Sequence, residues 1–128
     1  MAEYDDRGGV VATPAINPVS NSAGANGTSI NTKGYESVSF VAHLGAITSG
    51  TIVFTIEHAD DNGSGSAGSF GAIGSDDMIG TFPTFNTANT SGIVGYRGKK
   101  QWVRLVSSGT YSTAVHSATC ILANPKRI

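Results

Sequence analysis

Residues 35–44 read YESVSFVAHL, and apolar side chains stand at every second position of this stretch. Val38, Phe40 and Leu44 fall on one side of an extended chain, while Ser37 and Ser39 fall on the other. Because successive side chains of a β-strand point to opposite faces, this alternation predicts a strand with one buried face.

The same period continues in residues 51–59, TIVFTIEHA, where Ile52, Phe54 and Ile56 share one face. A glycine-flanked loop over residues 45–50 joins this run to the one before it. Two alternating runs with such a loop are typical of a β-hairpin. We therefore expect the two strands to pair as antiparallel neighbours.

Three further segments read as strands in the second half of the chain. Residues 93–96 and 101–106 predict a second hairpin through a turn at 97–100, and residues 115–123 predict a last strand after a turn at 107–110. The positions that these patterns place in the core are Val38, Phe40, Ile52, Phe54, Ile56, Trp102, Val106, Cys120 and Leu122.

The composition favours one all-β domain. Gly, Ser, Thr and Asn fill 53 of the 128 positions, and these residues favour turns and extended segments over helix interiors. A chain of this length forms one core. We expect a single compact antiparallel β-sandwich or small barrel with an extended N-terminal arm, and no helix longer than about two turns.

The chain divides into an arm, residues 1–33, and a β body, residues 34–128, with a loop-rich segment at 60–92. Pro14 and Pro18 keep the arm extended, and its short apolar islands can pair with a sheet edge. We expect the arm to contact a neighbouring subunit rather than its own body. A disordered terminus is the alternative.

The charge balance and the lack of long apolar runs argue against nucleic acid and membranes as partners. Charged residues make up 13% of the chain, against roughly 25% in soluble proteins. The net charge of −1 gives little support to nucleic-acid binding, so none is expected. No apolar run is long enough to span a membrane, and the first residues lack the pattern of a signal peptide. We expect a soluble protein made in the cytoplasm of its producer.

No residue pattern predicts catalysis, a cofactor or a metal. Cys120 lies in an apolar strand and reads as a core residue, not as a reactive thiol. His43 and His58 approach one another only if the first hairpin forms, and His116 has no ligand-type neighbour at a suitable spacing. The aspartate pairs at 60–61 and 76–77 read as turn residues, with calcium binding as the weaker alternative. We expect the protein not to be an enzyme.

Four basic residues within eight positions form the one charge cluster of the sequence. Such a cluster can meet an acidic partner, or can bind nucleic acid weakly beside the aromatic side chains of Tyr96 and Trp102. Basic residues that protect a hairpin from edge-to-edge association are an equal alternative. The cluster consists of Arg97, Lys99, Lys100 and Arg104.

Three strings together resemble small virion proteins of tailed phages: GYESVSF at 34–40, IEHADD at 56–61, and VGYRGKKQWVR at 94–104. The resemblance extends from about residue 30 to the C-terminus. It implies an all-β subunit, most similar to the capsid decoration or cement proteins that stabilise the head. Head–tail completion or tail proteins, and a carbohydrate-binding host-recognition module stacking sugars on Trp102, remain the alternatives.

The decoration role implies a virion protein on the capsid exterior that binds the major capsid protein. It also implies a homo-oligomer, with a trimer favoured. Together with the arm and the basic cluster, it predicts interface residues at Val10, Val11, Ile16, Phe82, Phe85, Arg97, Lys99, Lys100 and Arg104.

Overall fold

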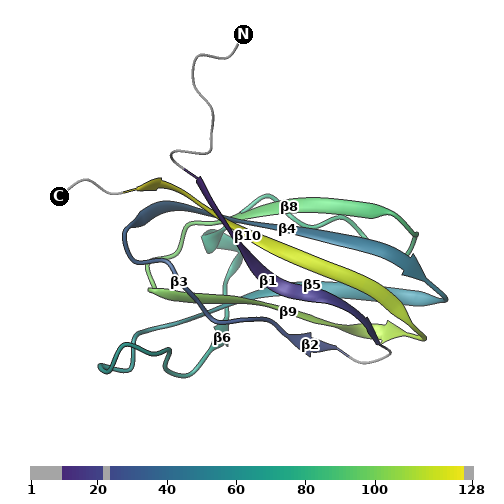
Figure 1. Ribbon diagram of the computed structural model, residues 1–128, viewed down its shortest axis with the longest axis horizontal. Coiled ribbons are helices and arrows are strands. Elements are labelled where there is room, and N and C mark those ends of the chain that lie inside the picture. The colour runs from purple at the N-terminus through teal and green to yellow at the C-terminus, as the bar shows by residue number, and fades with distance from the viewer. Residues whose placement is uncertain (1–9, 22–23, 126–128) are drawn as a thin grey trace, which may run out of the picture.

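The computed structural model describes residues 10–21 and 24–125, which form one sandwich of two antiparallel β-sheets (Figure 1). The predicted all-β fold is confirmed. Within these residues the only helical element is a 3-10 turn, η1, Ser75–Asp77. No helix in this part of the chain is long and apolar enough to cross a membrane.

Each sheet contains five strands. Sheet A has the order β1-β10-β4-β8-β7, and sheet B has the order β2-β9-β5-β6 with β3 beside β9. In chain order the strands are β1 Val10–Asn21, β2 Ala25–Asn26, β3 Ile30–Asn31, β4 Tyr35–Ile47, β5 Gly50–Ala59, β6 Gly71–Ala72, β7 Met78–Ile79, β8 Thr90–Tyr96, β9 Trp102–Tyr111 and β10 Ala114–Pro125.

The inward faces of the two sheets form one apolar core, as the alternating patterns predict. On β4 every second residue from Val38 to Leu44 is buried, and β5 buries Ile52, Phe54 and Ile56 in the same way. Seven of the nine predicted core residues are buried: Val38, Phe40, Ile52, Phe54, Ile56, Cys120 and Leu122.

The predicted hairpins are wrong, because each predicted partner lies in the opposite sheet. β4 pairs with β10 and β8, whereas β5 pairs with β9 and β6. The short link from β4 to β5 crosses the sandwich, and so does the link from β8 to β9. Side-chain alternation identifies which face of a strand is buried, but it does not identify the neighbour to which the strand hydrogen-bonds.

β9 faces the opposite way from the prediction. Val103 and Leu105 are buried, while Trp102 and Val106 are half-buried on the outer face of sheet B. The Trp102 indole N–H donates a hydrogen bond to Asp61 Oδ1 at 3.0 Å. Because this polar partner lies outside the core, the large aromatic side chain does not need to be inside it.

Residues 107–110 continue β9 instead of forming the predicted turn. Gly109 has φ +109, and a Cβ there would lie 2.5 Å from the Thr51 carbonyl oxygen. The glycine therefore permits a close approach of β5 rather than a reversal of the chain. The reversal comes later, between Tyr111 and Ala114.

Most of the predicted arm belongs to the body. β1 pairs with β10 along the edge of sheet A, and β2 and β3 pair with β9 in sheet B. Ala15, Ile16 and Ile30 are buried in the core. The prediction that this segment contacts a neighbour rather than its own body is therefore wrong for residues 10–21 and 24–33; residues 1–9 lie outside the described residues. Pro14 and Pro18 fit because an edge strand tolerates a missing N–H.

The loop-rich segment predicted at 60–92 contains only short elements, β6, η1 and β7, before β8. Phe85 is 1% exposed and packs edge-on against Phe54 with ring centroids 4.9 Å apart. Its backbone pairs with Ile52, so this part of the loop lies alongside β5. Phe85 is therefore a core residue, and its prediction as an interface residue is wrong.

A buried histidine lies in the core. His116 is 2% exposed, and its Nε2 lies 3.1 Å from the Ser107 hydroxyl oxygen in a hydrogen bond. The rings of Phe54 and Tyr111 pack edge-on against it. Burial lowers the pKa of His116 below its ordinary value, because a charged imidazolium would lose its hydration.

Deletion of residues 1–21 should abolish the cooperative thermal unfolding transition, because it exposes the edge of β10 and removes Ala15 and Ile16 from the core. Circular dichroism melting measures this. Deletion of residues 1–9 is the control and should leave the transition in place. An unchanged melting temperature in the larger deletion would contradict the role of β1 as a strand of the body.

Acidification should destabilise the protein through His116. Its pKa is lower in the folded state than the roughly 6.5 of an unfolded chain. The unfolded state therefore binds the extra proton first, and stability falls as the pH drops below about 6.5. The His116→Gln variant lacks this proton site, so its free energy of unfolding should fall less than that of the wild type as the pH is lowered from roughly 7 to 5. Urea titrations at each pH measure both values, and parallel pH profiles would contradict the prediction.

Candidate docking surfaces

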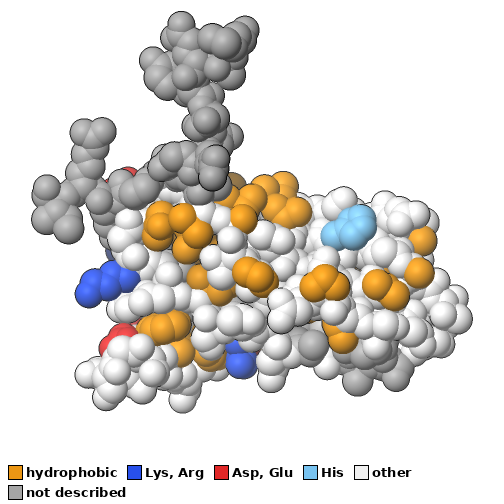
Figure 2. Space-filling model, in the orientation of Figure 1, with side chains coloured by type: hydrophobic (Ala, Val, Ile, Leu, Met, Phe, Trp, Pro, Cys, Tyr) orange, Lys and Arg blue, Asp and Glu red, His pale blue; other side chains and the backbone are white. Residues whose placement is uncertain are grey.

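The charged side chains of the described residues gather at one end of the sandwich, which we call the charged end. This is the end at which β4 begins and β8 ends, as the register of Val38 with Tyr96 shows. β5 ends and β9 begins there too, with Ala59 opposite Trp102. In Figure 2 the right half of the view shows no Lys, Arg, Asp or Glu side chain. The charged residues are Lys33, Glu36, Glu57, Asp60, Asp61, Asp76, Asp77, Arg97, Lys99, Lys100 and Arg104.

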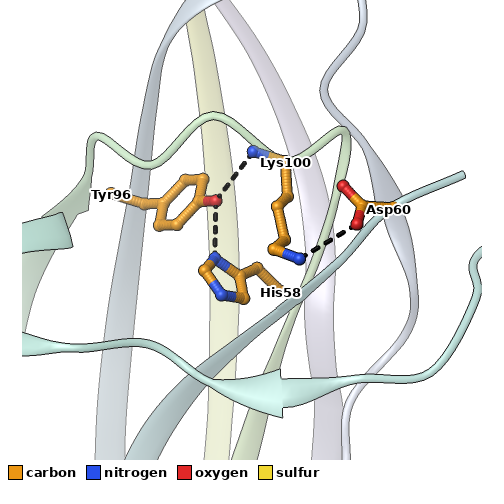
Figure 3. Close-up of polar contacts among 4 residues, drawn as sticks. All are labelled: His58, Asp60, Tyr96 and Lys100. Carbon is orange, nitrogen blue, oxygen red and sulfur yellow. Dashed lines mark hydrogen bonds and ion pairs between the residues drawn. The ribbon is translucent and has the colours of Figure 1, made fainter.

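A chain of polar contacts joins the two sheets at the charged end (Figure 3). His58 Nδ1 on β5 and the Tyr96 hydroxyl on β8 are hydrogen-bonded at 2.9 Å. The backbone N–H of Lys100 donates to the same hydroxyl at 3.3 Å, and Lys100 Nζ forms an ion pair with Asp60 at 3.0 Å. Burial raises the pKa of Tyr96 above its ordinary value, so the hydroxyl stays protonated and can donate to His58.

The loop after β5 is fixed by its own acidic residue. Asp61 Oδ2 accepts backbone N–H bonds from Gly63 and Gly65, while Oδ1 accepts the Trp102 indole N–H. The Trp102 bond, followed by that from Gly63, lowers the pKa of Asp61 below its usual range. The Asp61 carboxylate therefore stabilises the turn that follows β5.

The predicted basic cluster is not one continuous patch. Arg104 lies on the outer face of sheet B, where it pairs with Glu57 at 2.7 Å and stacks over the Phe70 ring. Lys100 pairs with Asp60, and Arg97 Nε donates to the Asp76 carbonyl oxygen at 2.7 Å. Lys99 is exposed, and no ion-pair partner for it is found among the described residues. Most of this positive charge is therefore balanced or anchored within the chain.

The apolar residues predicted for the interface fall into two groups. Ile16 is 5% exposed and lies in the core, so its prediction as an interface residue is wrong for the same reason as that of Phe85. Val11 is 41% exposed near the start of β1, and Phe82 packs partly buried against the core. Only the place of Val10 in β1, opposite Ala123, is described.

The rest of the sandwich carries no formal charge. The stretches 10–32, 37–56, 78–96 and 105–125 contain no Asp, Glu, Lys or Arg. They form most of both sheets and the whole of the end opposite the charged end, including the Thr48–Ser49 link. We call that opposite end the uncharged end. A second link that crosses the sandwich, residues 112–113 between β9 and β10, lies beside the Thr48–Ser49 link. The two links are joined by hydrogen bonds from Thr48 N–H to the Thr113 carbonyl and from Ser112 N–H to the Ser49 carbonyl.

The outer face of sheet A, which we call face A, combines this lack of charge with exposed aliphatic side chains. Ile93 is 59% exposed and Ile79 is 56% exposed. Serine, threonine and glycine fill most positions between the aliphatic residues, and His43 is the one titratable side chain among the described outward positions of β4 from Ser37 to His43 and their neighbours on β8 and β10. The large aliphatic residues of face A are Val41, Ile79, Ile93, Val115 and Ile121.

The described residues do not bring the candidate metal ligands together. No group of three or more His, Cys, Asp or Glu side chains that could hold a metal ion is found in residues 10–21 and 24–125. His43 and His58 belong to different sheets, so the hairpin that would bring them together does not exist. Burial raises the pKa of the Cys120 thiol to about 12, as expected for a core residue.

Comparison with known proteins identifies similar folds. No protein-family model and no curated protein matches the chain. The SPBc2 prophage-derived protein YomS matches 90% of this chain and 93% of its own, with 10% sequence identity and a TM-score of 0.54. This likeness shows a shared fold.

Two weaker matches lie below a TM-score of 0.5 and are not evidence of a shared fold. One is a chain of the Bacillus endospore appendages, described as disulfide-linked pili, with 11% identity, 98% coverage of both chains and a TM-score of 0.44. The other is a chain of infectious bursal disease virus Gx strain, with 14% identity, 88% coverage of this chain, 32% of that chain and a TM-score of 0.47.

The Tyr96→Phe substitution should destabilise the protein by about 1–3 kcal/mol, because it leaves His58 and the Lys100 N–H without their shared partner. Thermal and urea unfolding measure the loss. Tyr35→Phe is the control, since no hydrogen bond of the Tyr35 hydroxyl is found among the described residues. Equal stability of the two variants would show that the contact does not hold the sheets together.

Proposed function

We propose that this chain is a structural subunit of a tailed-phage particle, and within it a decoration or cement protein that binds the major capsid protein on the capsid exterior. The observation that carries the proposal is the segregation of charge. All described charged side chains lie toward one end, and the uncharged end, with the parts of both outer faces next to it, is left free of them.

A charge-free surface suits burial against another protein. A buried charge loses its hydration, which costs several kcal/mol unless a well-placed partner compensates. The centres of protein–protein interfaces are accordingly depleted in charged residues. In a subunit that stayed alone in water, nothing would favour the removal of Asp, Glu, Lys and Arg from one end only. The uncharged end therefore faces the capsid, and the charged end faces the solvent.

The comparisons support the phage assignment at the level of fold. YomS, a prophage-derived protein, shares the sandwich over nearly the whole of both chains. The three strings that resemble small virion proteins of tailed phages lie in the strands of this sandwich. Residues 34–40 begin β4, residues 56–61 end β5, and residues 94–104 link β8 to β9. A role at the head–tail junction or in the tail is the alternative within the particle.

Stabilisation of a shell follows from repetition of a modest contact. Each bound subunit adds contacts between capsid proteins, and the shell opens only when many of these contacts fail together. The cement role requires a rigid body with a dockable surface, and it requires no substrate turnover. The protein is then made in the host cytoplasm and is found on the virion.

A carbohydrate-recognition role is the second candidate because Trp102 lies on the outer face of sheet B rather than between the sheets. Its indole N–H is already bonded to Asp61, and the ion pair of Arg104 with Glu57 lies beside it. A sugar ring would therefore find an aromatic surface that is half-buried. This arrangement favours the docking role over the recognition role.

Addition of the purified protein to capsids that lack it should give co-sedimentation and a higher shell melting temperature. Because the docking surface is uncharged, affinity should change little between roughly 0.1 and 0.5 M salt, a range over which screening shortens electrostatic interactions. Calorimetry of the shells and sedimentation binding measure the two effects. Glycan binding without capsid binding would overturn the proposal and favour the recognition module.

The Thr48→Lys variant tests the orientation. It places a charge on an exposed turn of the uncharged end, so capsid affinity should fall at least roughly tenfold, equivalent to about 1.4 kcal/mol. Lys99→Thr is the matched control, because it removes an exposed charge at the other end and should bind as the wild type does. The reverse order of affinities would mean that the charged end faces the capsid.

A further inference from the structure

We propose that face A is a contact surface for a second copy of this chain, so that the protein pairs face to face through the outer side of sheet A. This contact goes beyond the docking to a capsid, and it uses a different part of the uncharged surface.

The other outer surfaces of the body are less suited to such a contact. The one long edge strand, β1, contains Pro14 and Pro18, which have no N–H to offer an added strand. The other edge strands with described bounds, β2, β3, β6 and β7, are two residues long. The outer face of sheet B carries the ion pair of Arg104 with Glu57, and the ring of Phe70 lies over it. Face A is left open.

The relief of face A is set by the strand register. Val41 on β4 lies beside Ile93 on β8, so two adjacent aliphatic side chains form a ridge. The next outward position along β4 is Ser39, and its neighbour on β8 is Gly95. Ile79 lies directly beside Gly95, where an added Cβ would be 3.1 Å from the Ile79 Cβ, so the low track runs over Ser39 and Gly95 between Ile79 and the ridge. A hollow of about 310 Å³ lies here, lined on this face by Ser37, Ser39, Ile79, Ile93 and Gly95, with Glu36 and Arg97 at its rim toward the charged end.

A ridge beside a track is complementary to itself. A two-fold rotation about an axis between them brings the ridge of one copy over the track of the other, and the second contact is identical to the first. Side chains near such an axis meet their own copies, so a charged residue there would repel itself. The outward positions of β4 run from Ser37 to His43. Neither these positions nor their described neighbours on β8 and β10 contain Asp, Glu, Lys or Arg. The face therefore has the charge pattern that self-association requires.

The area of face A is sufficient for a specific pair. The four longer strands of sheet A, β1, β10, β4 and β8, are each about 4.8 Å wide, and nine residues along β4 at about 3.3 Å each then give roughly 570 Å² in projection. The relief of the side chains brings the accessible area closer to the roughly 800 Å² per partner of a standard interface. The exposed side chains of Ile79 and Ile93 would then be removed from water.

The oligomeric state of the full chain tests this inference. Light scattering after size exclusion should give twice the 13.1 kDa of one chain for the wild type. Ile93→Lys and Ser39→Lys should each give a monomer, because both place a charge beside the axis. Val53→Lys is the matched control: Val53 is 47% exposed at an outward position of β5 in sheet B, so this variant should remain a dimer. Melting curves confirm that the variants are folded.

Each other outcome would overturn the pairing. A monomeric wild type, or a dimer that Val53→Lys disrupts and Ile93→Lys does not, would exclude face A as the contact. A mass of three chains would favour a trimer and contradict the face-to-face arrangement. If the wild type is monomeric but Ile93→Lys loses capsid binding, face A is a capsid contact: the proposed function then stands, and the pairing of copies fails.

Discussion

The main hydrogen-bonded neighbours of the long strands come from distant parts of the chain, because the short connections between long strands cross from one sheet to the other. β4 finds its partners in β8 and β10, and β5 finds its main partner in β9. Neither sheet can form first as a set of local hairpins, so the apolar faces must meet while the strands are pairing. Folds with such non-local contacts pay loop-closure entropy early and fold slowly. The inward residues Phe40, Phe54 and Leu105 thus hold the layers together and also fix which strands are neighbours.

This constraint explains how far the sequence could predict the fold. The alternation in 35–44 and 51–59 identified the buried faces of β4 and β5, because burial follows directly from side-chain direction. The sequence could not predict the hydrogen-bonded partner of each strand, because a link that crosses between sheets and a hairpin turn can have the same length and composition. The prediction placed the wrong face of β9 in the core because Trp102 is large and apolar. Its N–H bond to Asp61 depends on a loop whose path the sequence does not reveal. The pairing of β1 could not be predicted, because its prolines and few apolar residues suit an edge strand as well as a free arm.

The docking surfaces, like the fold, could be predicted only in part from the sequence. Arg97, Lys99, Lys100 and Arg104 are neighbours in sequence, but the strand start at Trp102 directs Arg104 to the outer face of sheet B and leaves the others at the end. The long stretches without charge are visible in the sequence. Their meaning appears only when the topology brings 33–36, 57–61, 76–77 and 97–104 to one end. Face A could not be predicted because Val41 and Ile93 belong to separate strands, and only the register places them side by side.

Both described ends of the chain lie at the charged end. β1 starts there, with Val10 opposite Ala123, and β10 finishes there, with Pro125 opposite Tyr35 (Figure 1). If that end points away from the shell, a peptide or a reporter domain fused to either terminus would be carried outward and clear of the lattice. The fold would then serve as a display scaffold with two attachment points, and antibody access to such fusions on intact particles would report which way the subunit stands.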